Sequence, residues 1–235
     1  MAIAAGGQRE RVAIVTGGSR GMGRETVERL ARLGYAVVVN YVHDQRTAES
    51  TVESVLEGRG AAVAIRADVT DVLDVDRLFT QTIETFGAVD AVVHAVRGHV
   101  AASSLTDLPL DDFDEMFRTS LRATFIVNRM AASLLSNGGA IVNLFSSVAA
   151  SALPAYDGYA PTAAAVDTLT RVLALELVER DITVNGVSLE VDKPCAPSRV
   201  AEVVTYLLGN DGHGITGHVI HLDDTPLPEV GRVPK

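Results

Sequence analysis

A glycine-rich segment near the N-terminus has the residue types and the spacing of a phosphate-binding turn. Residues 16–23 read Thr-Gly-Gly-Ser-Arg-Gly-Met-Gly and follow a short apolar run. Between a strand and a helix, such a turn lets backbone N–H groups and the positive helix end approach a pyrophosphate, because glycine has no Cβ in the way. A tight turn with a purely structural role is the alternative. We expect a dinucleotide to contact Thr16, Gly17, Ser19, Arg20, Gly21, Met22 and Gly23.

The charges near this segment indicate which dinucleotide it binds. An acidic residue at the end of the second strand would hydrogen-bond the ribose 2′-hydroxyl of NAD and repel the 2′-phosphate of NADP. That position reads Asn40-Tyr41, and the next carboxylate is Asp44. Arg20, inside the turn, can pair with a phosphate. The sequence therefore favours NADP(H), with contacts from Arg20 and Asn40, over the alternative that Arg20 is a solvated cation without a ligand.

The elements that must position these residues follow from the hydrophobic pattern. Apolar runs of strand length alternate with stretches of helical periodicity. Continuous apolar runs such as 36–39 are typical of a parallel sheet that is covered on both faces. The sequence predicts an α/β fold with a doubly wound parallel sheet, as a single domain over 1–235 with a loosely held tail after about 224. The expected strands are 12–16, 36–41, 62–67, 91–95, 140–145, 183–188 and 218–222, and the expected helices are 25–33, 48–56, 72–86, 112–135, 159–179 and 198–208.

Composition excludes several classes of protein. The 235 residues carry 20 Lys and Arg against 30 Asp and Glu, a net charge of −10, which disfavours a nucleic-acid partner. Cys195 is the single cysteine, so an internal disulfide framework and a cysteine-based metal site are both excluded. The chain shows no apolar run of signal-peptide or membrane-spanning length, and we expect a cytoplasmic protein without a membrane partner.

The sequence resembles the short-chain dehydrogenase/reductase family in its glycine-rich turn and at three later places. Thr16, Gly17, Gly21 and Gly23 match the family's Thr-Gly-x-x-x-Gly-x-Gly pattern. Asp68-Val69 resembles the family's pair that meets the adenine, Asn143 begins its Asn-x-x-Ser strand end, and residues 182–185 resemble its penultimate strand. The resemblance runs through most of the chain and is strongest to 3-oxoacyl-(acyl carrier protein) reductases. It implies a Rossmann-like fold, a small-molecule substrate that is either free or bound to a carrier protein, and a homo-oligomer, either a dimer or a tetramer.

The resemblance also implies catalytic residues, and here the family pattern breaks. Ser146 and Tyr159 have the family's spacing of thirteen residues between the active serine and the active tyrosine. The family's Tyr-x-x-x-Lys lacks its lysine, because that position is Ala163. Ser120, in the preceding long helix, stands where the family has its catalytic asparagine. Both ends of one proton relay are therefore replaced.

Further departures surround the place of the nicotinamide. The family's Asn-Asn-Ala-Gly reads His94-Ala95-Val96-Arg97, and its Pro-Gly reads Leu189-Glu190. The segment 191–199, which covers the substrate in family reductases, is short. The chain thus keeps the features that hold adenosine and pyrophosphate and alters those that hold nicotinamide and move protons.

These residues lead to one main hypothesis for function and two alternatives. Without the lysine, a tyrosine with an ordinary pKa near ~10 stays protonated at neutral pH, so it can donate a proton but is a poor base. The main hypothesis is an atypical NADP(H)-dependent carbonyl reductase that acts through Tyr159 and Ser146. The alternatives are a non-redox enzyme, such as a cyclase, isomerase or dehydratase, and a catalytically silent nucleotide-binding partner. His94, His99 and Asp157 are candidates to replace the relay.

Overall fold

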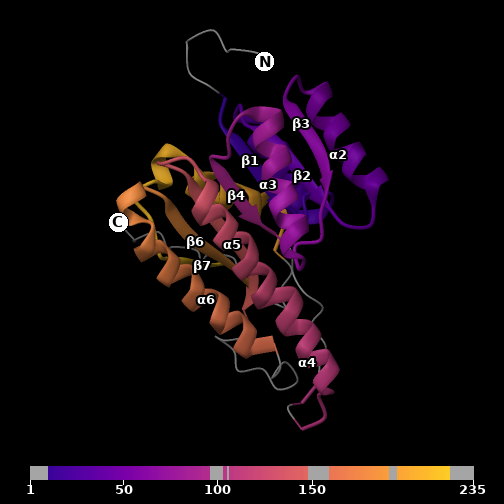
Figure 1. Ribbon diagram of the computed structural model, residues 1–235, viewed down its shortest axis with the longest axis vertical. Coiled ribbons are helices and arrows are strands. Elements are labelled where there is room, and N and C mark those ends of the chain that lie inside the picture. Colours follow the sequence, from indigo (N-terminus) through magenta and orange to yellow (C-terminus); the bar gives the residue numbers. More distant parts are fainter. Residues whose placement is uncertain (1–9, 96–102, 105, 148–158, 191–194, 223–235) are drawn as a thin grey trace, which may run out of the picture.

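A seven-stranded parallel sheet forms the centre of the molecule, in the order β3-β2-β1-β4-β5-β6-β7 (Figure 1). The computed structural model describes residues 10–95, 103–104, 106–147, 159–190 and 195–222. The strands are rich in valine, alanine and isoleucine, and the inner strands are buried on both faces, as the apolar runs predict, whereas the edge strands β3 and β7 are partly exposed. Their bounds are β1 Val12–Thr16, β2 Ala36–Tyr41, β3 Ala61–Arg66, β4 Ala91–His94, β5 Ala140–Ser147, β6 Thr183–Glu190 and β7 Val219–Leu222.

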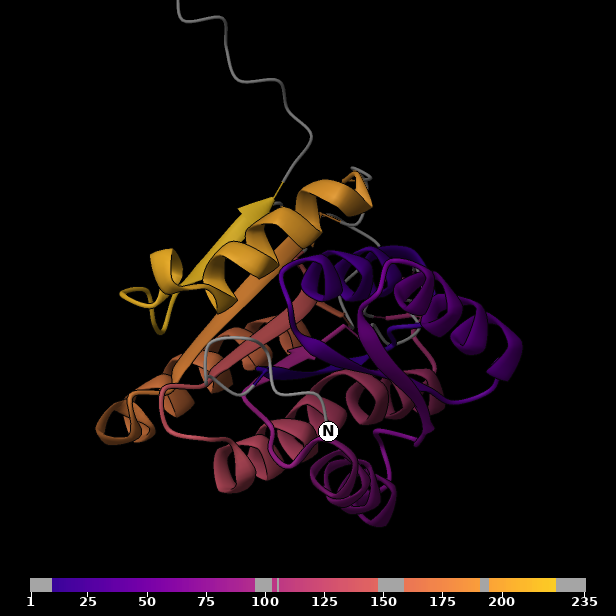
Figure 2. The ribbon, with the colours of Figure 1, turned by 90° about the horizontal axis from the view of Figure 1, so that it is seen from above.

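Helices cover the sheet on both faces (Figure 2). One apolar core lies between the sheet and α1, α2 and α7, and a second lies between the sheet and α3, α5 and α6. This arrangement confirms the predicted doubly wound α/β fold. The helices are α1 Gly21–Arg32, α2 Gln45–Glu57, α3 Val72–Phe86, α4 Leu110–Met116, α5 Ala123–Leu134, α6 Tyr159–Glu176 and α7 Pro197–Leu208, with short 3₁₀ turns at Val178–Arg180 and Asn210–Gly212.

The long helix predicted over 112–135 is confirmed as a continuous helical segment, but it is not regular throughout. A π-helical turn, η1 (Phe117–Arg122), separates α4 from α5. Two threonine hydroxyls, one within this turn and one just after it, bond carbonyl oxygens four residues earlier: Thr119 donates to Glu115 and Thr124 donates to Ser120. Such bonds compete with the regular ladder and bend helices. Ser120 therefore lies in an irregular turn.

The order of the strands indicates which end of the sheet binds a ligand. The chain runs outward from β1 through β2 to β3 and then returns to β4 on the other side of β1. In doubly wound sheets, ligands bind at the carboxyl ends of the strands where this reversal occurs. The glycine-rich turn follows β1, and Ser146 lies near the end of β5, so both lie at the carboxyl ends of the strands.

In the part of the chain that is described, no helix combines the length and the apolarity that crossing a membrane requires.

Candidate active site

The glycine-rich turn has a backbone that only glycine adopts without strain. Gly17 and Gly21 have φ angles of 65° and 56°, in the left-handed region. A Cβ atom at Gly23 would collide with the carbonyl oxygen of Gly17, so the start of α1 packs directly against the turn. Among the described residues, α1 has no side-chain cap and no acidic residue in its first turn. Its N-terminal N–H groups are thus available to an anion, and the turn fits a pyrophosphate.

Other residues predicted to contact the cofactor hold the turn in place. Thr16 and Ser19 are buried, and the carbonyl oxygen of Ser19 accepts a hydrogen bond from the hydroxyl of Thr51 on α2 at 3.1 Å. Met22 packs partly buried against the core beneath α1. These contacts fix the turn between α1 and α2, so the backbone of the turn is rigid before any ligand binds.

Asn40 lies at the end of β2, but its side chain turns into the protein. It is 1% exposed, and its Nδ2 donates to the carbonyl oxygen of Ala67 at 2.9 Å. Its own carbonyl oxygen accepts the N–H of Gly18 at 3.1 Å. Asn40 therefore joins the glycine-rich turn to the end of β3. This geometry supports a positioning role, whereas the direct contact with the cofactor stays a prediction.

Arg20 and Asp44 are the two charged residues that the sequence relates to the choice between NAD and NADP. Arg20 is exposed at the start of α1. The carboxylate of Asp44 caps α2 by accepting hydrogen bonds from the hydroxyl and the N–H of Thr47, and these bonds, together with the charge of Arg20, hold the pKa of Asp44 below its ordinary value. Because the helix cap already occupies this carboxylate, Asp44 is a poor partner for a ribose hydroxyl.

Asp68 and Val69 form a tight turn after β3 that is held from two sides. One carboxylate oxygen of Asp68 accepts both the N–H and the hydroxyl of Thr70, at 2.9 and 2.8 Å. The N–H of Asp68 donates to Asp74 at 2.8 Å, and this bond is the main reason that the pKa of Asp74 is lowered. Val69 is buried. The turn is thus rigid, as a surface that meets an adenine would need to be.

Two arginines of the π-helical turn reach across to the same segment. Arg118 donates to the hydroxyl of Thr70 at 2.6 Å while pairing with Glu115 on its own helix at 2.8 Å. Arg122 donates to the carbonyl oxygen of Thr70. The structure shows that these arginines tie the Asp68–Thr70 turn to the helix that carries Ser120.

The predicted catalytic residues come from three elements. Ser146 is buried near the end of β5, in register with Leu189 of β6. Ser120 is 7% exposed, and its hydroxyl has no hydrogen-bond partner among the described residues. Tyr159 is the first residue of α6, and its side chain lies outside what the structure describes. The structure thus places Ser146 and Ser120 in buried positions, and the role of the three residues as a catalytic group stays a prediction.

The position of the missing lysine is apolar. Ala163 is 3% exposed and packs in a small cluster with Met116, Phe145 and Val166. Met116 ends α4, just before the π-helical turn, and Phe145 directly precedes Ser146. Among the described residues of this cluster there is no cation. The family's ammonium group is therefore replaced by side-chain packing.

His94, a candidate to replace the relay, is fully buried at the end of β4. Its Nδ1 lies 2.9 Å from the hydroxyl of Thr16. Burial lowers the pKa of His94 to about 4. The ring is therefore neutral at pH 7 and does not exchange protons there as an acid–base group, which argues against a relay role. The other two candidates, His99 and Asp157, lie outside the described residues.

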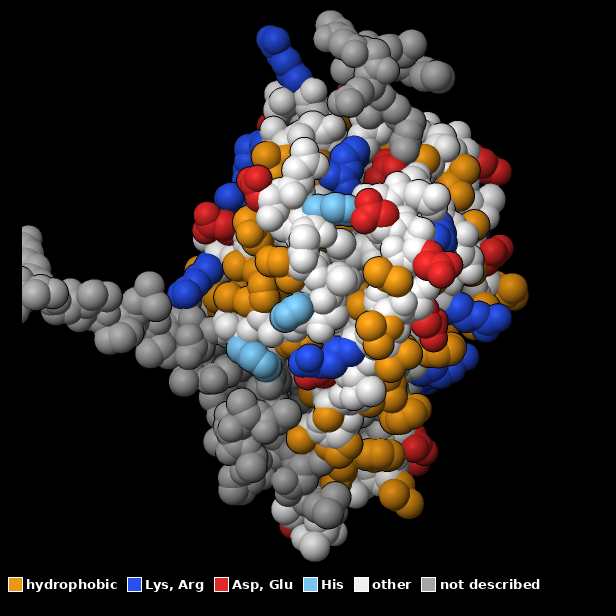
Figure 3. Space-filling model, turned by 90° about the vertical axis from the view of Figure 1, so that its left-hand side faces the viewer, with side chains coloured by type: hydrophobic (Ala, Val, Ile, Leu, Met, Phe, Trp, Pro, Cys, Tyr) orange, Lys and Arg blue, Asp and Glu red, His pale blue; other side chains and the backbone are white. Residues whose placement is uncertain are grey.

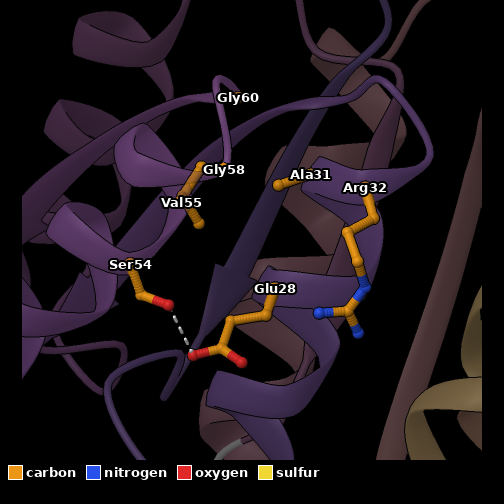
Figure 4. Close-up of a pocket in the computed structure, with 7 residues that line it drawn as sticks. All are labelled: Glu28, Ala31, Arg32, Ser54, Val55, Gly58 and Gly60. Atoms are coloured by element: carbon orange, nitrogen blue, oxygen red, sulfur yellow. Dashed lines mark hydrogen bonds between the residues drawn. The ribbon is translucent and has the colours of Figure 1, made fainter.

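A cavity of about 140 Å³ opens between α1 and α2, at the end of the sheet opposite to the glycine-rich turn (Figure 4). Inside it, the hydroxyl of Ser54 donates to Glu28 at 3.2 Å. Its volume is below the several hundred Å³ typical of ligand pockets. We therefore assign no part of the active site to this cavity, which is lined by Glu28, Ala31, Arg32, Ser54, Val55, Gly58 and Gly60.

Comparison with known proteins agrees with this geometry. A family model described as enoyl-(acyl carrier protein) reductase matches residues 17–191. Tetrahydroxynaphthalene reductase from Pyricularia oryzae is 30% identical over 250 residues, which cover 91% of this chain and 88% of that protein. The crystal structure of a short-chain dehydrogenase from Burkholderia cenocepacia in complex with NADP is 31% identical and superposes with a TM-score of 0.84, over 92% of this chain and 97% of that one. The chain belongs to the short-chain dehydrogenase/reductase family.

A dehydrogenase/reductase from Sinorhizobium meliloti is similar to the same extent, with 31% identity, a TM-score of 0.85 and coverage of 92% of this chain and 94% of that one. The described sheet and the helices that cover it therefore have the arrangement of these related structures. Several residues that depart from the family pattern cannot be placed, because Val96, Arg97 and 191–194 lie outside the described residues, as does the tail from 223. Leu189 is buried in β6.

Sequence reasoning missed two features of the site in this short-chain dehydrogenase/reductase. The first is the pair of hydrogen bonds from Arg118 and Arg122 to Thr70, for which two arginines that flank Ser120 in the sequence were a usable signal. The second is Asn128, a fully buried polar residue of α5 that lies two helical turns after Ser120. Its signal was a polar residue on the apolar face of a predicted helix.

Proposed function

We propose that the protein is an NADP(H)-dependent carbonyl reductase in which Tyr159 and Ser146 act without the usual lysine and asparagine relay. The observation that carries this proposal is the intact phosphate-binding turn, with left-handed Gly17 and Gly21 before the uncapped start of α1. The related Pyricularia oryzae protein is named a reductase, and the related Burkholderia cenocepacia structure holds NADP.

The choice of NADP(H) rests on the charges beside the turn. Arg20 is exposed and provides a cation for the 2′-phosphate, while the Asp44 carboxylate is engaged at the N-terminus of α2. A phosphate gains charge-assisted hydrogen bonds from a guanidinium, whereas an NAD ribose would find no free carboxylate at the end of β2. Asp68 and Val69 would hold the adenine.

The bound cofactor would supply the hydride. Ser146 would hydrogen-bond the carbonyl oxygen and stabilise the charge that develops on it, and Tyr159 would donate the proton. Ala163 places no cation beside Tyr159, so nothing at that position favours the phenolate that alcohol oxidation needs as a base. We therefore infer that the protein reduces ketones better than it oxidises alcohols near neutral pH.

The relative's name indicates a first class of substrate. Because the Pyricularia oryzae relative is named for a tetrahydroxynaphthalene, we propose a hydroxylated aromatic ketone of that size as the small-molecule substrate. A ketone that is tethered to an acyl carrier protein is the alternative, and the two are compared directly in the same assay.

The test measures NADPH consumption with each ketone, by the absorbance of the reduced nicotinamide, for the wild type and for Tyr159→Phe. We expect turnover in the wild type and at least a hundredfold loss in Tyr159→Phe, the range that a general acid contributes. Product formation by nucleotide-free protein would instead show a non-redox enzyme. Tight NADPH binding without turnover on any ketone would support a catalytically silent partner.

A further inference from the structure

A group of buried polar atoms between the sheet and the helices α5 and α6 has no hydrogen-bond partner among the described residues. The group comprises Nε2 of His94, both amide atoms of Asn128 and Oδ1 of Asn143. The three residues are at most 1% exposed. Buried polar side chains in native proteins are nearly always hydrogen-bonded, so several unpartnered atoms in one layer indicate that a small polar ligand binds there.

The three residues lie in the same layer of the structure. His94 and Asn143 are register partners on β4 and β5. Two residues earlier on these strands, Val92 and Ile141 face the core under α3, α5 and α6, and side chains alternate along a strand, so His94 and Asn143 face it as well. Asn143 confirms this direction, because its Nδ2 donates to Thr170 of α6 at 3.0 Å.

Asn128 lies at nearly the same height along the sheet as His94. The N–H of Ser136, just after α5, donates to the carbonyl oxygen of Val89, just before β4. From this shared point, Asn128 lies about 12 Å back along the helix and His94 about 16 Å along the strand. A helix that links parallel strands runs opposite to them, so the two positions differ by only about 4 Å in height. Side chains of this length bridge such an offset.

The chemistry of the atoms defines the ligand. The hydroxyl of Thr16 accepts the N–H of Ala95 at 3.1 Å and lies 2.9 Å from Nδ1 of His94. Nε2 of His94 is a donor in one tautomer of the neutral ring and an acceptor in the other. Oδ1 of Asn143 is an acceptor, and the Asn128 amide offers both kinds of group. The ligand must therefore donate and accept hydrogen bonds, and its size must fit between a helix and the sheet it covers.

We propose that His94, Asn128 and Asn143 bind internal water between α5 and the sheet. Water has the required two donors and two acceptors, and buried waters commonly make about three hydrogen bonds to such groups. The site joins the glycine-rich turn, through Thr16 and His94, to the helix that carries Ser120. Asn128 is thus a positioning residue, since it connects the two halves of the family's binding edge and touches neither substrate nor cofactor.

The first test compares the thermal unfolding midpoints of Asn128→Leu and Asn128→Ser. Leucine displaces the water and leaves the His94 and Asn143 atoms unpaired, so we expect the midpoint to fall by about 2 to 8 °C. Serine leaves a polar group and more room for water, so we expect a smaller fall. The proposal is overturned if leucine leaves the midpoint unchanged or raises it. A buried amide that binds no water destabilises the folded protein, so its replacement by leucine would not lower the midpoint.

Thr183→Val is the matched control, because the Thr183 hydroxyl is also buried without a partner but stands alone at the start of β6. We expect its midpoint to be unchanged or raised.

A second measurement does not depend on variants: a crystal structure of the wild type should show a water within hydrogen-bond distance of Nε2 of His94 and of Asn128. Direct contact between these side chains with no water between them would overturn the proposal.

Discussion

At the scale of single residues, His94 carries a protonation state that burial alone determines. Burial lowers its pKa to about 4, from the ordinary value of 6.5, and no charged group contributes. Above about pH 6.5 the histidine is neutral in both the folded and the unfolded state, so it does not lower the free energy of unfolding. Below that pH the unfolded chain binds the proton more readily than the folded protein. Stability is then lost as the pH falls from 6.5 towards 4.

We expect His94→Asn to remove this part of the acid sensitivity. The wild type should lose up to about 3 kcal/mol more unfolding free energy than the variant between pH 7 and pH 4, because the shift spans more than two pKa units. Urea unfolding at several pH values measures how steeply the free energy of unfolding changes with pH. A loss of stability that is equal at every pH would not change this slope. The exposed His43→Asn is the control, and equal slopes for wild type and His94→Asn would refute the assignment.

Single residues also show the limit of sequence reasoning. The absence of a carboxylate at Asn40 could be read directly and supports the choice of cofactor. The direction of its side chain, towards the carbonyl of Ala67, depends on how β2 and β3 pair. Arg118 is similar, since its partner Thr70 is 48 residues away in the sequence. Types and spacings could therefore be predicted, whereas partners that only the fold brings together could not.

At the scale of elements, the strands and most helices follow from the hydrophobic pattern, because buried parallel strands and amphipathic helices have different periods. The π-helical turn at 117–122 could not be predicted in this way. Threonine hydroxyls bond the carbonyl four residues earlier in regular helices of this protein as well, so Thr119 and Thr124 give no signal for it. Arg118 and Arg122 of this turn bond the segment after β3.

We expect Arg118→Ala and Arg122→Ala to weaken the binding of the adenosine half of the cofactor. Each loses a hydrogen bond to Thr70 that holds the Asp68–Thr70 turn, and an exposed charged bond of this kind is worth about 1 kcal/mol, or about fivefold in affinity. Calorimetry with 2′,5′-ADP measures the effect. Arg129→Ala, on α5, is the control. An equal loss in this variant would show a general effect of charge instead.

Restoring the relay with Ala163→Lys and Ser120→Asn should not yield an efficient ketone reductase. The new lysine would enter the apolar cluster of Met116, Phe145 and Val166, so the variant should unfold at a lower temperature. Hydride transfer also needs a nicotinamide and a carbonyl aligned within roughly 3 to 3.5 Å, and Arg97 and Glu190 replace residues that align them in the family. Steady-state turnover above about 1 s⁻¹ on simple ketones would contradict this prediction.

At the scale of the whole molecule, the outer surfaces of α5 and α6 expose several large apolar side chains. Figure 3 shows hydrophobic side chains gathered over its right-hand part, where these helices lie. They include Phe125, which is 49% exposed, and Leu175, which is 78% exposed. A surface of this kind suits a second copy of the chain, and it supports the proposal of a homo-oligomer.

Light scattering coupled to size-exclusion chromatography tests this proposal. We expect a dimer or a tetramer for the wild type and a shift towards the monomer for Phe125→Glu combined with Leu175→Glu. The matched control places the same charges at Leu56 and Leu73, which are exposed on α2 and α3. A monomeric wild type, or an unchanged mass in the α5/α6 variant, would refute the interface.

The central claim is that the nucleotide half of this short-chain dehydrogenase/reductase is intact and selects the phosphorylated cofactor. Titration calorimetry of the wild type and of Arg20→Ala with NADPH and with NADH tests it most directly. We expect the wild type to bind NADPH at least tenfold more tightly than NADH, and Arg20→Ala to lose most of that difference while its NADH affinity stays the same. Tighter binding of NADH by the wild type, or no binding of either nucleotide, would contradict the account.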